Sequence, residues 1–376
     1  MAGIYIHIPY CKKACIYCNF HFRTSQNDQK EMLKCIELEL QSRRDYLKNK
    51  IISTIYFGGG TPSLLNKDEI KSILEIVNKN YKLNKNIEIT LECNPDDLSQ
   101  NKLIEFKEVG INRLSIGVQS FNDNHLSFMN RSHSCKESIE GIKIAKKVGF
   151  KNITIDLIYG IPNQTLSEWK KDLEKMVALD ILHFSSYALT VEDNTRLNFL
   201  VKNKKVKPLI DSKVNEQFML LVDIANHYGF IQYEISNFAR NEYFSKHNTA
   251  YWENKHYIGV GPSAHSYNGY SRSWNISSNK KYIKGIITND DYYKDEILTI
   301  KQQYNEYILT SLRTIWGVCF KSIKNRFPEE MHTHFKKAVE KWIIRKLIKK
   351  TGSIYTLTSS GKLLADSISS DLFLLE

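Results

Sequence analysis

Apolar segments of strand length alternate with segments of helical period along the first half of the chain. Strands are predicted at residues 4–8, 53–57, 87–92, 113–118, 152–158 and 182–189. Between the first two, Leu33, Ile36 and Leu40 recur on one helical face. Alternating strands and helices indicate a parallel sheet with helices outside it. Because six units are too few for an eight-stranded barrel, we predict a partial (β/α)6 barrel over residues 1–230.

The second half of the chain has a weaker pattern. Residues 231–299 are rich in Tyr, Asn, Ser and Gly, and we expect an irregular region there. Residues 300–376 are helical and basic, and they include a short strand, a turn and a final helix. We therefore predict a small helical, winged-helix-like C-terminal domain. Because fold alone does not set function, we expect it to act as a packing or lid domain rather than in DNA binding.

Composition and charge favour a cytoplasmic location. The chain has 376 residues, of which 42% are hydrophobic, yet no apolar run approaches the roughly 20 residues needed to span a bilayer. Its first residues lack the basic-then-apolar order of a signal peptide. Lys and Arg number 53 against 41 acidic residues, a net charge of +12. The lysines are spread over the whole chain without a nucleic-acid-binding motif, so we predict no nucleic-acid partner. A weak attraction to anionic membrane surfaces stays open.

Three of the seven cysteines are close together directly after the first predicted strand. Cys11, Cys15 and Cys18 have the spacing C-x-x-x-C-x-x-C. Thiolates are soft ligands that suit iron–sulfur clusters and zinc. Three of them can hold three corners of a four-iron cluster and leave the fourth iron free for a small molecule. Zinc is the alternative, with His7 or His21 as the fourth donor.

The sequence Tyr5-Ile-His-Ile-Pro-Tyr-Cys11, followed by Cys15 and Cys18, resembles the opening of radical S-adenosylmethionine proteins. The resemblance is greatest to the group around oxygen-independent coproporphyrinogen III oxidase, and within it to the heme-chaperone branch. It covers essentially the whole chain. It implies a [4Fe-4S] cluster on the three cysteines, whose open iron binds the amino and carboxylate groups of S-adenosylmethionine.

Polar residues and glycines occupy the ends of successive predicted strands. Gly58-Gly59-Gly60-Thr61 follows the second strand, Glu92 ends the third, Gln119 ends the fourth and Asp156 lies in the fifth. Each alone could be an ordinary turn, capping or polar residue, but together they mark one edge of a parallel sheet, where barrels place their chemistry. The resemblance implies cofactor contacts at Tyr5, Tyr17, Gly59, Gly60, Thr61, Glu92, Gln119, Arg131, Asp156 and Ala188.

The resemblance leads to two functions of different classes. One is an oxidase that converts coproporphyrinogen III to protoporphyrinogen IX through a 5′-deoxyadenosyl radical. The other is a chaperone that binds heme and delivers it to an acceptor protein. Phe20 stands where the oxidases carry an additional cysteine, and Asn19 stands where the chaperones usually have aspartate. The oxidases also have an N-terminal extension, whereas this chain reaches its first strand at Ile4.

The segment from His247 to Trp252 resembles the H-N-x-x-Y-W motif of the chaperone branch. Histidine is a common axial heme ligand, so we expect His247 to contact heme, with a hydrogen-bonded loop histidine as the alternative. We expect His265 in the same cavity. The prediction is a heme chaperone with heme, a [4Fe-4S] cluster and S-adenosylmethionine, and the oxidase is the alternative. Expected partners are a heme acceptor, membrane-associated acceptors included, and an electron donor if S-adenosylmethionine is cleaved.

Overall fold

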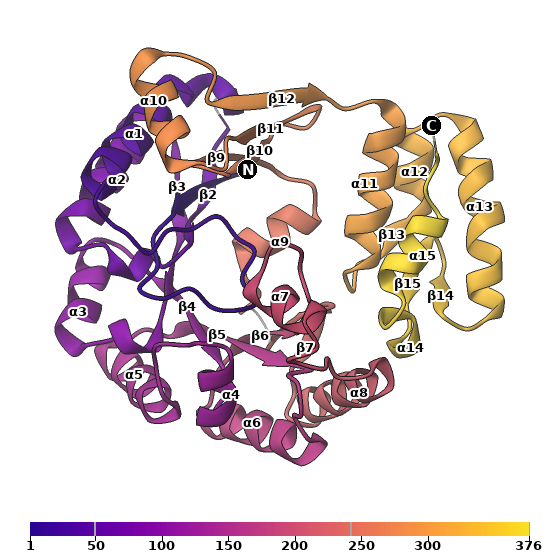
Figure 1. Ribbon diagram of the computed structural model, residues 1–376. Coiled ribbons are helices and arrows are strands. Elements are labelled where there is room, and N and C mark those ends of the chain that lie inside the picture. Colours follow the sequence, from indigo (N-terminus) through magenta and orange to yellow (C-terminus); the bar gives the residue numbers. More distant parts are fainter. Residues whose placement is uncertain (49, 241–242, 376) are drawn as a thin grey trace.

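Six parallel strands form the centre of the computed structural model, which describes residues 1–48, 50–240 and 243–375 (Figure 1). They are β1 (Ala2–Ile8), β2 (Ile52–Gly59), β3 (Leu83–Cys93), β4 (Arg113–Gln119), β5 (Asn152–Tyr159) and β6 (His183–Ala188), each paired in parallel with the next. Every predicted strand is therefore confirmed. Only β3 begins clearly earlier than predicted, at the polar segment that starts with Leu83.

Helices cover the outer face of these strands (Figure 1). They are α1 (Gln29–Ser42), α2 (Lys67–Asn80), α3 (Gln100–Glu108), α4 (Asp123–Phe128), α5 (Cys135–Val148), α6 (Leu166–Ala178) and α8 (Asp211–His227), with α7 (Arg196–Lys202) protruding beyond the sheet, and with short 3₁₀ turns at Arg44–Leu47, Pro62–Leu64 and Pro95–Asp97. Leu33, Ile36 and Leu40 are buried against the sheet, as their spacing predicts. Gly149 ends α5 with φ +97°, a left-handed helix end that favours glycine.

Residues 231–299 continue the same sheet, so the prediction of an irregular region is wrong. The region contains β7 (Ile231–Glu234), β8 (Asn237–Ala239), β9 (His256–Val260), β10 (His265–Tyr267), β11 (Ser271–Asn275), β12 (Tyr293–Ile297), α9 (Lys246–Trp252) and α10 (Asn279–Thr288). Within the described residues the strand order is β12-β11-β10-β9-β1-β2-β3-β4-β5-β6-β8-β7. The strands are short and partly polar, and β9 finds its parallel partner β1 more than 250 residues away, so no local pattern signals them.

One buried carboxylate ties this part of the sheet to the barrel. Glu39 on α1 has no exposed surface and accepts hydrogen bonds from the Gly261 amide, the Asn275 side chain and the Tyr282 hydroxyl. Arg43 pairs with it at 2.9 Å. A buried charge is tolerated when it is paired and hydrogen-bonded in this way.

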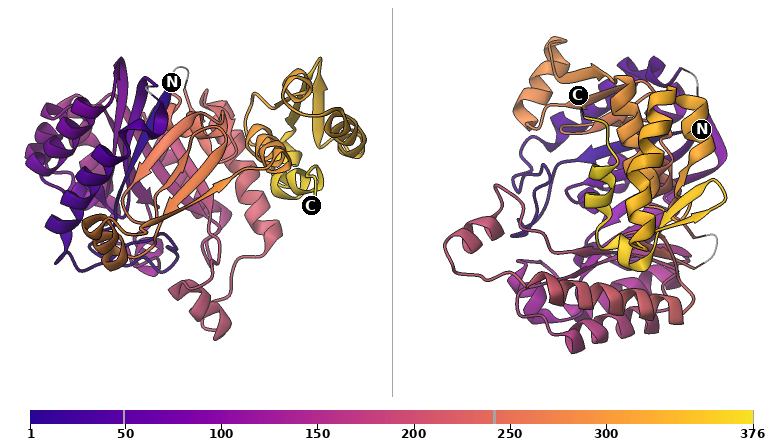
Figure 2. Two further views of the ribbon diagram at one scale, coloured as in Figure 1. Left: turned by 90° about the horizontal axis from the view of Figure 1, so that it is seen from above. Right: turned by 90° about the vertical axis from the view of Figure 1, so that its right-hand side faces the viewer.

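The C-terminal region has its own core and packs beside the barrel (Figures 1 and 2). It comprises α11 (Ile300–Leu312), β13 (Val318–Cys319), α12 (Phe320–Arg326), α13 (Glu329–Ile344), β14 (Ile348–Thr351), β15 (Ile354–Leu357), α14 (Ser359–Lys362) and α15 (Ala365–Asp371). The helical character is confirmed. Backbone hydrogen bonds from Ile235 to Arg313 and from Ile315 to Tyr233 join it to β7. Among the described residues, no helix has the length and apolarity to cross a membrane.

Candidate functional site

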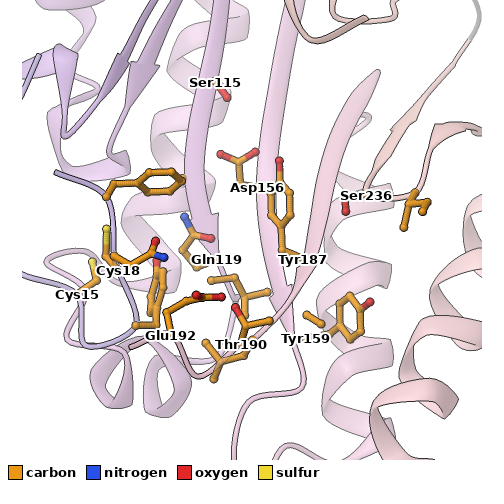
Figure 3. Close-up of a pocket in the computed structure, with 18 of the residues that line it drawn as sticks. Cys15, Cys18, Ser115, Gln119, Asp156, Tyr159, Tyr187, Thr190, Glu192 and Ser236 are labelled. Atoms are coloured by element: carbon orange, nitrogen blue, oxygen red, sulfur yellow. The ribbon is translucent and has the colours of Figure 1, made fainter. Parts of the chain in front are cut away.

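A cavity of about 960 Å³ lies at the carboxyl ends of the central strands. Its lining includes Cys11, Cys15, Cys18 and every residue predicted to contact the cofactor except Tyr5. Figure 3 shows Cys15 and Cys18 on one side and Ser236 on the other, with Asp156 and Tyr187 between them. The volume lies at the upper end of the range typical of ligand pockets. The strand-end pattern in the sequence thus corresponds to one continuous site.

The segment that follows β1 and carries Cys11, Cys15 and Cys18, here called the cysteine loop, is fixed to three parts of the barrel. The Thr61 amide donates to the Tyr10 carbonyl at 2.6 Å. Lys12 forms ion pairs with Asp96, at 2.9 Å, and with Asp97. On the other side the Asn130 side chain donates to the Ala14 carbonyl at 2.7 Å. These contacts within the protein hold the cysteine loop in place without a bound ligand.

Two glycines after β2 allow the cysteine loop to approach closely. Gly59 has φ +111°, and a β-carbon there would lie 2.7 Å from the His7 ring. A β-carbon at Gly60 would lie 2.5 Å from the carbonyl oxygen of Tyr10. Both glycines also line the cavity. The tight-turn explanation is therefore sufficient for their identity, and their cofactor contact stays a prediction.

Side chains at the cavity wall contact two of the three sulfur atoms. The Thr61 hydroxyl donates to Cys11 Sγ at 3.4 Å, and Arg131 Nη1 donates to Cys15 Sγ at 3.2 Å. Arg131 Nη2 donates to Asn94 Oδ1 at 2.6 Å and to the Gly117 carbonyl at 2.9 Å. Arg131 Nε is buried, with no protein partner among the described residues. The guanidinium therefore joins the cysteine loop to the ends of β3 and β4, and its positive charge fits an anionic cluster beside it.

The donor set fits an iron–sulfur cluster better than zinc. Among the described residues, no three His, Cys, Asp or Glu side chains are arranged to hold a single metal ion. His7 Nε2 donates to the His21 carbonyl at 2.8 Å, and His21 Nε2 is hydrogen-bonded to Asn279 Oδ1 at 2.8 Å. Neither histidine has that nitrogen available as a fourth zinc ligand. Burial raises the pKa of Cys11 to about 12, so its thiolate form needs the compensating charge of a metal.

Two carboxyl groups of the central strands line the cavity, Glu92 on β3 and Asp156 on β5. Glu92 accepts from the Tyr56 hydroxyl at 2.8 Å and from the Gly59 amide at 3.2 Å. Burial raises the pKa of Glu92 to about 7 and that of Asp156 to about 6. Gln119 ends β4 with φ +67°, a strained conformation of the kind that clusters at binding sites.

Tyr5 does not line the cavity, unlike the other residues predicted to contact the cofactor. It belongs to an aromatic stack inside the barrel, with ring centroids 6.1 Å from Tyr56 and 6.4 Å from His247. Its hydroxyl hydrogen-bonds His7 Nδ1 at 3.2 Å. Tyr5 therefore packs beneath the cavity wall, and its cofactor contact stays a prediction.

His247 also lies in this stack, and the structure does not support its predicted heme contact. The ring is buried, Nδ1 is 2.7 Å from the Thr54 hydroxyl and Nε2 is 2.8 Å from the Tyr251 hydroxyl. Heme ligation would require breaking one of these hydrogen bonds in a closed interior. Trp252 Nε1 donates to Asn248 Oδ1 at 2.8 Å, so the whole H-N-x-x-Y-W motif is bonded within the protein. His265 is exposed beside Trp274 and does not line the cavity, which corrects that expectation.

Sequence reasoning missed several residues of the cavity wall. Asn94 holds Arg131, and its place two residues after Glu92 was the one available signal. The exposed ring of Tyr187 also lines the cavity. The C-terminal region contributes Arg313 and residues 362–367, at least 313 − 18 = 295 residues from the cysteines. No spacing rule connects segments so far apart.

Comparisons with known proteins agree with this geometry. Residues 5–176 match the model of the Radical SAM superfamily, and residues 298–364 match that of the HemN C-terminal domain. The structure of coproporphyrinogen III oxidase (HemN) from Escherichia coli superposes with a TM-score of 0.85 over 99% of this chain and 90% of that one. Its 22% identity shows the shared fold alone. Fold and site thus define a radical SAM protein.

Relatives in sequence narrow the assignment. Heme chaperone HemW of Bacillus subtilis (strain 168) is 34% identical over 98% of both chains. The mitochondrial radical S-adenosyl methionine domain-containing protein 1 of Danio rerio is 38% identical over 70% of this chain and 60% of its own length. The chain belongs to the HemW family.

Proposed function

We propose that this protein is a cytoplasmic heme chaperone that binds a [4Fe-4S] cluster, S-adenosylmethionine and heme, and passes the heme to an acceptor protein. The observation that carries this proposal is the 34% identity to Heme chaperone HemW of Bacillus subtilis over 98% of both chains. Phe20 points the same way, because it stands at the position of the additional oxidase cysteine and lines the cavity. We include membrane-associated proteins among the candidate acceptors.

The residues around the cavity divide into two groups under this proposal. Cys11, Cys15 and Cys18 would hold the cluster, and Arg131 would balance its negative charge. The strand-end residues would hold S-adenosylmethionine: Tyr17, Gly59, Gly60, Thr61, Glu92, Gln119, Asp156 and Ala188. Bound together, cluster and S-adenosylmethionine supply one-electron chemistry when an external electron donor is present.

The rest of the cavity combines aromatic rings with polar and charged side chains. The rings of Phe20, Tyr159, Tyr187 and Phe218 line it, and Phe20 is 70% exposed. Aromatic rings pack favourably on a flat conjugated ligand. We place heme in this part of the cavity rather than at His247, whose ring nitrogens are both engaged.

Two measurements on anaerobically purified protein test the proposal. The protein is expected to contain close to four irons and four sulfides and to shift the Soret band of added heme. Cys11→Ser should remove the cluster, whereas the control Cys135→Ser on α5, outside the cavity, should retain it. Incubation with coproporphyrinogen III, reductant and S-adenosylmethionine should yield no protoporphyrinogen IX. Turnover in that assay would replace the chaperone with the oxidase.

A further inference from the structure

The C-terminal domain supplies one wall of the cavity, and this wall carries two positive charges. Arg313 follows α11, and Lys362 ends α14. Both line the cavity together with residues 363–367. The other cations in the lining, Lys13 and Arg131, belong to the cysteine loop and its support. The cavity therefore has one pair of cations beside the cysteine loop and a separate pair on the wall made by the C-terminal domain.

The charge of Arg313 is already balanced within the protein. Its Nε and Nη2 donate to Glu234 Oε1 at 3.0 and 2.9 Å. Glu234 is almost fully buried, and its other oxygen accepts from the Ser236 amide and the Asn237 side chain. Arg313 Nη1 reaches the exposed carboxylate of Asp366 at 3.3 Å. This guanidinium and the buried carboxylate thus satisfy each other.

Lys362 forms no ion pair with a carboxylate in the described part of the chain. Its Nζ donates to the neutral amide oxygen of Gln232 at 2.7 Å, and this is the one hydrogen bond that the ammonium group makes with the described residues. An ammonium group has three donors, so two are left for other acceptors. The nearby carboxylate of Glu234 is saturated by Arg313 and its amide donors. Burial lowers the pKa of Lys362, and the nearby Glu234 carboxylate offsets only part of this shift.

We propose that Lys362 binds a carboxylate of the cavity ligand, which under the proposed function is a propionate of heme. The inference rests on that function, because heme presents its carboxylates at one edge of an otherwise apolar ring. With the ring beside Tyr187 and Phe218, a propionate at Lys362 would fix the orientation of heme in the cavity. Asp366 and Glu192 also line the cavity, but their negative charge cannot pair with a carboxylate.

The test compares heme with heme dimethyl ester, in which both propionates are neutral. Affinities for holoprotein with cluster and S-adenosylmethionine are measured from the Soret shift. Wild type should bind heme about tenfold or more tightly than the ester, as expected for one charge-assisted hydrogen bond. Lys362→Gln should abolish this preference by weakening heme alone. Lys362→Arg should retain it, and Lys349→Gln on the exposed face of β14 is the matched control.

Each outcome has a distinct meaning. If wild type binds neither compound, the proposed function fails. If the preference for heme persists in Lys362→Gln, heme binds this cavity or another without Lys362, and the inference is overturned. Equal weakening of heme and ester in Lys362→Gln would assign the residue to packing against Gln232, which also overturns it.

Discussion

Gly60→Ala tests whether the cluster depends on the close approach between the cysteine loop and the end of β2. The new β-carbon would lie 2.5 Å from the Tyr10 carbonyl oxygen, 2.7 Å from its amide nitrogen and 2.9 Å from the Ile8 carbonyl oxygen. Real β-carbons essentially never come closer than 3.0 Å, so backbone must move by at least about 0.5 Å, from 3.0 − 2.5. Cofactor sites lose function at displacements of about this size.

The cost follows from the contacts that such a movement disturbs. Overpacking of this kind costs about 1–3 kcal/mol. The hydrogen bonds from the Gly60 amide to Ile8 and from the Thr61 amide to Tyr10 would stretch, at about 0.5–1.5 kcal/mol each. Because these effects overlap, we expect a loss of about 2–4 kcal/mol in unfolding free energy. The cysteine loop takes most of the displacement, so cluster content should fall as well.

The assay is iron and sulfide content after anaerobic reconstitution, alongside thermal unfolding of the cluster-free protein. Gly352→Ala is the control, because its β-carbon would meet nothing within 4 Å although its φ is +59°. That variant should lose about 1–2 kcal/mol from backbone strain and keep its full cluster. A Gly60→Ala protein with wild-type stability and four irons would refute the reasoning.

Three further changes probe the same site. Because the folded-state pKa of Glu92, about 7, exceeds its ordinary value of 4.5, the cluster-free protein should lose stability as pH rises from 4.5 to 7. Denaturant titrations should show a smaller decline in Glu92→Gln, and an unchanged decline would contradict the assignment. His247→Ala leaves the Thr54 and Tyr251 hydroxyls unpaired in the barrel, so its melting temperature should drop by the equivalent of about 2–4 kcal/mol, with heme affinity of the folded fraction retained. Selective loss of heme binding at wild-type stability would restore His247 as a ligand. Arg131→Met should lower cluster content because Cys15 loses its guanidinium partner, and full iron occupancy in this variant would count against that role.

The sequence predicted the barrel well because its strands are buried on both faces. Strands rich in branched apolar residues, such as β5, identify themselves locally, and the glycine that ends α5 marks the start of the next strand. β12 is fully exposed along its length and joins the sheet only as an edge strand. Such a strand has no apolar pattern to detect. Its place depends on partners that only the folded chain brings together.

The candidate site was predictable where its residues depend on the order of the barrel strands. Residues at the ends of β2 to β6 share one sheet edge, so their proximity follows from the strand order. Tyr5 and His247 could not be placed, because a side chain in a barrel can face either the cavity or the layer beneath it. The wall made by Lys362 depends on how the C-terminal domain packs against β7, which pairing rules within the barrel do not determine.

The two sides of the cavity are made at widely separated times during protein synthesis. Cys18 and Lys362 are separated by 362 − 18 = 344 residues. At translation rates of about 5–20 residues per second, roughly 17–70 s pass between their emergence from the ribosome. Throughout that interval the face of the cysteine loop that turns toward the cavity has no C-terminal wall opposite it. A bulky iron–sulfur carrier would therefore have the freest access to the three cysteines on the nascent chain, before the C-terminal wall has been made.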